Sequence, residues 1–257
     1  MLFEFPTQEN WLKLVSTYPF KNWDIPPFAL QLDEKSVGVN DQMQVHLSMP
    51  IWEMHLQNRL ADVQRSYVFL MYYFELGIPD AEWMISPGKN GTGISYFPHF
   101  DHRHYKIKDQ FDYFTDIFYY KAFSVWDTVG QMLNEMYLLR LKVDKVDFKT
   151  SIEKLKDAGN GLHSDLLTIW NDEGFKKARG LRHSISHRHP ENKQGPTFAR
   201  RKTNDTDGFT AGGCSYTPSK EIVDNVVKVL ELISTTLEVL SVRCSSIRPE
   251  GGLVITV

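Results

Sequence analysis

The amino-acid sequence predicts an all-α protein, folded as an up-and-down helical bundle with a partly helical N-terminal extension. Two long segments carry apolar residues at every third or fourth position, which is the period of one face of an α-helix. A third such segment follows Thr217 and Pro218, a pair typical of a helix start. Hydrophobic residues make up 42% of the 257-residue chain and aromatic residues 13%, so we expect a soluble protein with a large core.

Residues 1–107 are predicted to form the extension. One short helix is expected near Glu9–Ser16, and a long amphipathic helix from Ile51 to about Gly77. Residues 79–107 are expected to connect it to the bundle, because prolines and glycines recur there. Before residue 51, prolines are expected to interrupt any long element, at Pro6, Pro19, Pro26, Pro27 and Pro50.

Residues 108–257 are predicted to form the bundle. Its first helix is expected to start near Asp109 and to continue to Met136, because the apolar period persists over this stretch. The segment Thr150-Ser-Ile-Glu153 fits a capping box, in which the hydroxyl and the carboxylate accept hydrogen bonds from free backbone N–H groups, and it predicts the start of a shorter helix. A break is expected at Gly159-Asn-Gly161.

The end of the bundle is predicted to contain a basic helix, a long loop and a final helix. Asp172 is expected to cap the basic helix, which ends before Pro190. Residues 190–216 lack apolar periodicity, and a loop of this length is typical of a functional or a disordered segment. The final helix is expected to start at Thr217–Pro218, and the tail 251–257 to pair as a strand or to fray.

The composition favours a cytoplasmic protein without a membrane anchor. The N-terminus lacks the basic and apolar regions of a signal peptide, and no apolar run approaches the roughly 20 residues that span a bilayer. The two cysteines, Cys214 and Cys244, form no pair motif, as is expected in a reducing compartment.

Positive charge is concentrated in one segment of an otherwise acidic chain. The formal net charge is −3, yet Lys176–Lys202 contains nine lysines and arginines against one acid, Glu191. That segment therefore carries +8, and the rest of the chain carries −11. A local field of this kind favours an anionic partner such as RNA or a nucleotide, and a solvated basic loop is the alternative interpretation.

One segment, from Arg179 to His189, carries side chains suited to phosphate-ester chemistry. Imidazoles transfer protons near neutral pH, and the forked donors of guanidinium groups match a phosphate. A solvated helix end, where the helix dipole favours cations, is the alternative interpretation. On an ideal helix Arg182 and His187 lie about 140° apart, so they converge only if the arginine wraps around the helix or the helix loosens near His187.

The stretch Arg182-His183-Ser-Ile-Ser-His187 resembles the signature of the HEPN superfamily (higher eukaryotes and prokaryotes nucleotide-binding domains), in which a polar residue follows an arginine and a histidine follows a few positions later. The placement near the end of the penultimate helix of a bundle is also similar, and the resemblance covers about residues 108–247. It implies a ribonuclease that uses no metal or other cofactor, acts as a homodimer with two facing motifs, and leaves a 2′,3′-cyclic phosphate.

The resemblance also implies roles for individual residues. His187 would act as general base or acid on the ribose 2′-hydroxyl or the leaving oxygen, Arg182 would hold the scissile phosphate, and His183 would position or assist. A toxin-like role with an antitoxin or another protein partner is one expectation, and a non-catalytic module that binds nucleotide, RNA or protein is the alternative. The neighbouring groups expected to bind phosphate or RNA are Arg179, Arg188, His189, Arg200, Arg201 and Lys202.

A second cluster, within residues 99–104, offers a different function. Histidine and aspartate are ligands of zinc and other divalent ions, so a metal-dependent enzyme is a further alternative. The competing interpretation is that these histidines cap or line the start of the helix expected at Asp109. The candidate ligands are His99, Asp101, His102 and His104.

Overall fold

The computed structural model describes residues 4–18, 20, 23, 25, 27–32, 34–87, 93–157, 161–187, 190–193, 196–203, 206–213 and 216–244. Within these residues the helices are α1 (Gln8–Thr17), α2 (Val39–Glu75), α3 (His102–Met136), α4 (Phe148–Lys154), α5 (Leu162–Asn171), α6 (Glu173–His187) and α7 (Ser219–Cys244). The strands are β1 (Met84–Pro87), β2 (Gly93–Tyr96), β3 (Pro196–Thr203) and β4 (Thr206–Gly213). None of the helices in this part of the chain is long and apolar enough to cross a membrane.

The chain divides into two compact units, and α2, α3, α6 and α7 each contribute a stretch to both. The first unit contains residues 1–18, 65–120 and 177–228, and the second contains residues 19–64, 121–176 and 229–257. Each unit is therefore assembled from segments that are far apart in the sequence.

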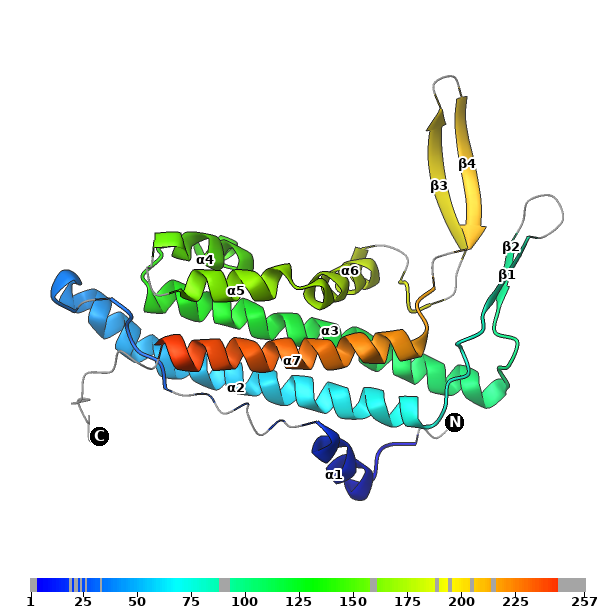
Figure 1. Ribbon diagram of the computed structural model, residues 1–257, viewed down its shortest axis with the longest axis horizontal. Coiled ribbons are helices and arrows are strands. Elements are labelled where there is room, and N and C mark those ends of the chain that lie inside the picture. The colour runs from blue at the N-terminus through cyan, green and yellow to red at the C-terminus, as the bar shows by residue number, and fades with distance from the viewer. Residues whose placement is uncertain are drawn as a thin grey trace. The chain divides into compact units, whose positions relative to one another are not determined.

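In the first unit, α2, α3 and α7 lie side by side (Figure 1). The rings of Phe69 on α2 and Phe114 on α3 stack with their centroids 4.6 Å apart. The buried hydroxyl of Tyr119 on α3 donates a hydrogen bond of 2.8 Å to Oδ1 of Asn225 on α7. Aromatic burial between the helices and a satisfied polar contact hold this part of the bundle together.

In the second unit, the buried ring of Phe175 on α6 lies within an aromatic cluster. Its centroid is 4.6 Å from that of Trp126 on α3 and 5.1 Å from that of Trp170 on α5. The indole N–H of Trp126 donates to Oγ1 of Thr236 on α7 at 3.0 Å, so the polar edge of the ring is also satisfied. The cluster fixes the start of α6, the helix that carries the Arg–His motif, by which we mean Arg182, His183 and His187.

The prediction of a helical bundle is confirmed, and so is the short helix α1, but α2 is longer than expected. It begins at Val39 rather than Ile51 and contains Pro50, so the expectation that Pro50 interrupts any long element was wrong. A proline inside a helix costs about 3 kcal/mol, because it removes one hydrogen bond and its ring crowds the preceding turn. Val45 and Met49 before it and Leu56 after it are buried, and their burial offsets this cost.

Two further helix starts also differ from the expected positions. Helix α3 begins at His102 rather than Asp109, because the Asp101 carboxylate accepts hydrogen bonds from the backbone N–H groups of Arg103 and His104, at 2.8 and 3.0 Å. Helix α4 begins at Phe148, and its cap is Asp147, which accepts from the N–H of Thr150 at 2.7 Å. The predicted capping box at Thr150 was therefore wrong.

The last two helices begin close to their predicted positions. Asp172 precedes α6, and its carboxylate accepts from the N–H of Gly174 at 2.7 Å, as expected of a cap. The predicted break before α5 is confirmed, since that helix starts just after Gly161. Helix α7 starts at Ser219, one residue later than Pro218. The tail 251–257 lies outside the described residues.

Two antiparallel hairpins occupy segments that were expected to be connectors or loops. Strands β1 and β2 pair within the connector, and β3 and β4 pair within residues 190–216, with Thr203 opposite Thr206. The four strands were not predicted because none of them shows an alternation of apolar and polar residues over its whole length.

A buried ion pair holds Asn192, which lies between α6 and β3 in the chain. The Lys108 ammonium on α3 donates to Oδ1 of Asp112 at 2.5 Å and to the backbone carbonyl of Asn192 at 2.7 Å. The amide of Asn192 in turn donates to Oδ1 of Asp116 at 3.1 Å. Lys108, Asp112 and Asn192 are each at most 5% exposed, so removal of one partner would leave a charge or a dipole buried without compensation.

The segment that follows β4 is held in a similar way. The buried Asp80 carboxylate accepts from the hydroxyl of Tyr216, from the backbone N–H of Ser219 at 2.9 Å and from the Ser219 hydroxyl at 2.6 Å. The backbone N–H of Thr217 donates to the carbonyl of Glu191 at 2.7 Å. The residues on either side of the hairpin are therefore joined through Thr217 and Glu191 and are anchored to Lys108 and Asp80.

Gly130 tests the packing of α3 on α4. A Cβ atom at this position would lie 2.7 Å from the carbonyl carbon of Asp147 and 2.8 Å from the nitrogen of Phe148. We expect Gly130→Ala to lower the free energy of unfolding by about 2 kcal/mol or more, because backbone must move. At Gly180 on α6, an added Cβ would meet no atom within 4 Å apart from its chain neighbours and the backbone of its own helix. Gly180→Ala should therefore raise the free energy of unfolding by up to about 1 kcal/mol. Urea denaturation measures the free energy of unfolding of both variants. Equal changes would contradict the close packing of α3 on α4 at Gly130.

Asp112 predicts a pH dependence of stability. Burial raises the pKa of Asp112 from 3.8 to about 7 although Lys108 opposes the shift. The folded state therefore binds more protons than the unfolded state between about pH 4 and pH 7, and this carboxyl lowers the free energy of unfolding as the pH rises through that window. In urea denaturation at pH 5, 6 and 7, Asp112→Asn should reduce the dependence of the free energy of unfolding on pH. Asp109→Asn, an exposed carboxyl on the same helix, should leave it unchanged.

Candidate functional site

Helix α6 places the motif residues on its last three turns. Arg179 and His183 are exposed and Arg182 is half-buried. The helix remains a regular α-helix through His187, so the backbone positions of residues 182 and 187 lie about 140° apart around its axis. The helix does not loosen before His187, which removes one of the two ways in which Arg182 and His187 of one chain could converge.

The Arg182 side chain is directed at a tyrosine of α3. Its guanidinium carbon lies 5.8 Å from the centre of the Tyr120 ring, within the range of a cation–π contact. Tyr120 is 44% exposed, so the arginine is positioned on an aromatic surface that is still open to solvent. This contact gives the guanidinium a defined place without enclosing it.

A serine between the two motif residues completes the arrangement. The Ser186 hydroxyl donates to the backbone carbonyl of Arg182 at 2.8 Å, and its oxygen lies 2.5 Å from the Tyr120 hydroxyl. A serine has one hydroxyl proton, so the tyrosine is the donor in the second contact. Tyr120 therefore contacts α6 twice, through its ring at Arg182 and through its hydroxyl at Ser186.

Tyr120 and Ser186 were not predicted as site residues. Ser186 stands four positions after Arg182, so it shares a helix face with the arginine, and this spacing could have identified it. No local pattern links Tyr120 to residues more than sixty positions away, and only the packing of α3 against α6 reveals it.

Several predicted site residues lie outside the residues whose side chains the structure describes. These are His187, whose backbone ends α6, and Arg188 and His189, which follow it. The backbone of the basic triplet lies in β3, where Arg200, Arg201 and Lys202 are opposite Phe209, Gly208 and Asp207 of β4.

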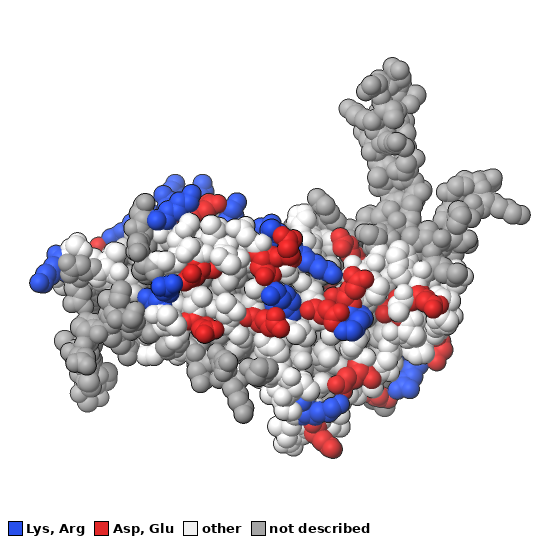
Figure 2. All heavy atoms as spheres, in the orientation of Figure 1, with Lys and Arg blue, Asp and Glu red and all other residues white. Residues whose placement is uncertain are grey.

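Positive charge on α6 is partly balanced by neighbouring acids. Lys177 lies 3.5 Å from the carboxylate of Glu221 on α7, and Lys176 lies 2.7 Å from that of Glu173 one turn earlier. On the face shown in Figure 2, described lysines and arginines are interspersed with aspartates and glutamates. The part of α6 that follows Lys177 contains arginine and histidine but no acid in its sequence.

The histidine–aspartate cluster before α3 has local structural contacts. His99 Nε2 lies 2.8 Å from Glu82 Oε2, and Nδ1 of His104 accepts from the N–H of Asp101 at 3.1 Å. Hydrogen bonds from the backbone N–H groups of His104 and Arg103 lower the pKa of Asp101, as befits a helix cap. His102 is exposed. Among the residues described, no three His, Cys, Asp or Glu side chains are placed to hold one metal ion.

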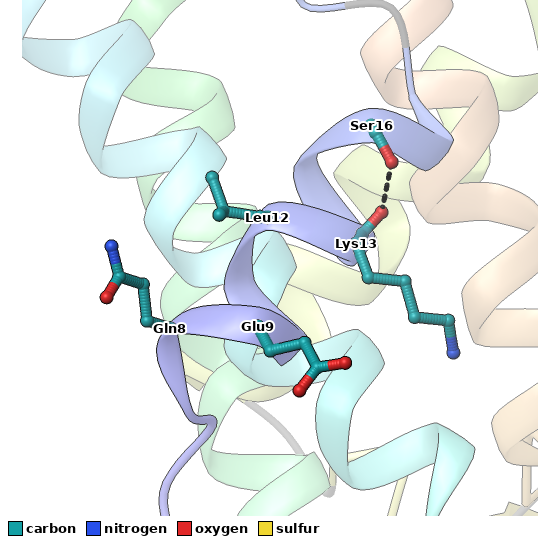
Figure 3. Close-up of a pocket in the computed structure, with 5 residues that line it drawn as sticks. All are labelled: Gln8, Glu9, Leu12, Lys13 and Ser16. Carbon is teal, nitrogen blue, oxygen red and sulfur yellow. Dashed lines mark hydrogen bonds between the residues drawn. The ribbon is translucent and has the colours of Figure 1, made fainter.

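A shallow hollow lies along α1 and is not connected with the motif chemistry. It is lined by Gln8, Glu9, Leu12, Lys13 and Ser16 (Figure 3). The ammonium group of Lys13 pairs with Glu75 at 2.8 Å, and the hydroxyl of Ser16 donates to the carbonyl of Lys13 at 2.7 Å. Two of its polar groups therefore already have protein partners, and its lining contains no histidine or arginine.

Comparison with known protein families gives one match that covers most of the chain. The family model for Cthe2314-like HEPN domains matches residues 52–242, a range that includes most of α2 and all of α3 to α6. The match begins inside the region that the sequence analysis assigned to an N-terminal extension. Comparison with curated proteins and with solved structures gave no significant match. With the helical bundle described above, this match shows that the chain belongs to the HEPN-like family.

Proposed function

We propose that the chain is a metal-independent endoribonuclease that cleaves RNA through the Arg–His motif of α6. The observation that carries the proposal is the position of Arg182, whose guanidinium is held 5.8 Å from the ring centre of a solvent-exposed tyrosine in a HEPN-like chain. A positioned, permanently charged group beside open solvent is suited to bind a phosphate diester.

The proposed reaction needs one base, one acid and one anion-binding group. A base removes the proton of the ribose 2′-hydroxyl, the 2′-oxygen forms a bond to phosphorus, and the bond from phosphorus to the 5′-oxygen breaks. The leaving 5′-oxygen takes up a proton, so the products are a 2′,3′-cyclic phosphate and a 5′-hydroxyl. His187 supplies or accepts protons, Arg182 stabilises the negative charge that grows on the phosphate oxygens, and His183 assists.

Helix α3 supports this role because it holds the chain on both sides of the histidine. Before His187, Ser186 contacts Tyr120 of α3 at 2.5 Å. After it, Asn192 contacts Lys108 and Asp116, also on α3, at 2.7 and 3.1 Å. Both attachments are therefore made by the same helix, α3.

A homodimer would resolve the angular separation of the two motif residues. Because α6 is regular through His187, the backbone positions of Arg182 and His187 point to different sides of the helix. Two copies with facing motifs would allow the arginine of one chain and the histidine of the other to contact one phosphate. The proposal accordingly includes a homodimer in the cytoplasm, with RNA as substrate and an antitoxin or another protein as a regulatory partner.

The same angular separation favours a second candidate function. If the two motif residues do not meet at one phosphate, Arg182 and its basic neighbours still form an anion-binding surface. The chain would then bind RNA or a nucleotide without cleaving it. A measurement of RNA cleavage distinguishes this binding function from the nuclease.

The first prediction concerns the motif. The purified protein should cleave RNA in the presence of EDTA and leave 2′,3′-cyclic phosphate ends. Arg182→Ala and His187→Ala should each lower the rate about 100-fold or more, because each removes a group that stabilises the transition state. Cleavage is followed with an end-labelled oligonucleotide, and thermal unfolding checks that the variants fold.

Matched controls are available on α2. His46→Ala and Arg59→Ala remove an imidazole and a guanidinium from exposed positions outside the motif, and they should retain wild-type cleavage. RNA binding without turnover in the wild type would support the binding module, and cleavage that survives His187→Ala would exclude the motif as the active centre.

The second prediction concerns the positioning of Arg182. Tyr120→Ala removes the cation–π contact, worth about 1 kcal/mol, and should lower kcat roughly fivefold. Tyr120→Phe keeps the ring and should stay near the wild-type kcat. Tyr113→Ala, a similar loss at an exposed tyrosine of the same helix, is the control. If Tyr120→Ala and Tyr113→Ala have equal effects, Tyr120 has no specific role in positioning the arginine.

A further inference from the structure

The first half of α2 exposes a continuous row of large apolar side chains. Each of five residues between positions 39 and 54 is more than half exposed, from 52% for Met54 to 78% for Val39. The opposite side of the same stretch is buried in the second unit, through Val45, Met49 and Leu56. The exposed residues are Val39, Met43, Leu47, Ile51 and Met54.

These side chains form one ridge. The first four are each separated by four positions, so they follow a single row along the helix surface, and Met54 continues it one turn after Ile51. The row is about 22 Å long at the rise of an α-helix. It ends where Gln57 and Asn58 take the corresponding exposed positions.

The row is large for a surface that remains in water. Five such side chains, each more than half exposed, leave on the order of 500 Å² of apolar surface, which is near the upper end for monomeric proteins. The largest apolar patch on a monomer is often a functional surface. A ridge on one helix packs best into the groove of another helix, so the expected partner presents a helix.

The charges around the row indicate which partner fits. Residues 39–58 contain no lysine or arginine, and their only acids are Asp41 and Glu53. Asp41 lies 2.6 Å from Arg140, and Glu53 accepts from the N–H of Phe28 at 2.6 Å. A helix that binds a membrane surface carries basic residues beside its apolar face, and a charged partner needs opposite charges. Neither feature is present in this stretch.

We infer that residues 39–54 of α2 form a contact with the same residues of a second copy of this chain. In a two-fold contact each charged group meets its own kind, so a nearly uncharged ridge avoids repulsion. Two identical ridges of residues spaced by four can interdigitate with the helices crossed at about 50°, the commonest helix packing. The inference goes beyond the proposed nuclease and holds whether or not the motifs also pair.

The area of the row determines how strongly two copies are expected to associate. Stable interfaces bury about 800 Å² on each partner, and this row alone supplies less. The association should therefore be weak and should depend on protein concentration.

The test is sedimentation equilibrium of the full chain over a wide range of concentrations. Leu47→Glu and Ile51→Glu place a charge in the centre of the row at exposed positions, where folding tolerates it. Each variant should show about half the particle mass of the wild type at high concentration, with unchanged thermal unfolding. Ala61→Glu makes a similar change at an exposed position of α2 beyond the row, and it should associate like the wild type.

Three outcomes would overturn the inference. The wild type could keep the same mass as the variants at every concentration, or Leu47→Glu could associate as strongly as Ala61→Glu. The wild type could also co-sediment with anionic vesicles in a manner lost in Leu47→Glu, which would identify a membrane as the occupant. RNA cleavage measured on the same preparations is a separate readout, since the nuclease proposal uses α6 and not this row.

Discussion

The attachment of one helix, α3, to the chain on both sides of the motif is the constraint on which the site depends. Tyr120 contacts Arg182 and Ser186 before the histidine, and the buried Lys108–Asp112 pair holds Asn192 after it. A buried ion pair contributes little net stability, but it is costly to leave half-made, so it specifies one arrangement. The same pair anchors the entry to the β3–β4 hairpin, and Asp80 anchors its exit.

The helical bundle, and the position of Arg182 and His183 near the end of its penultimate helix, could be predicted from the sequence because both depend on local patterns. Apolar periodicity identified the long helices, and Asp172 marked the start of α6 correctly. The predicted starts of α2 and α3 were wrong because contacts outside the apolar pattern extend both helices. The polar residues that follow Asp101 show no apolar period, yet they are helical because Asp101 caps α3. Helix α2 continues past Pro50 because residues on both sides of the proline are buried.

The rest of the site depends on packing between segments that are distant in the sequence. Nothing around Tyr120 distinguishes it from the exposed Tyr113 on the same helix, and only its contact with α6 assigns it a role. The β3–β4 hairpin is set by strand pairing and by anchors at its base rather than by an apolar alternation. The ion pair between Lys108 and Asp112 has the spacing of an ordinary surface pair, and burial alone makes it structural.

The most direct test of the central claim is a structure of the protein with an RNA oligonucleotide whose riboses are 2′-O-methylated, which blocks the attacking oxygen and preserves the phosphates. The account predicts that one phosphate lies within hydrogen-bond distance of the Arg182 guanidinium, with an imidazole of His187, from the same or a second copy, at its 2′-oxygen or 5′-oxygen. A bound phosphate backbone that passes elsewhere on the protein, with Arg182 still on Tyr120 and no contact to α6, would contradict it.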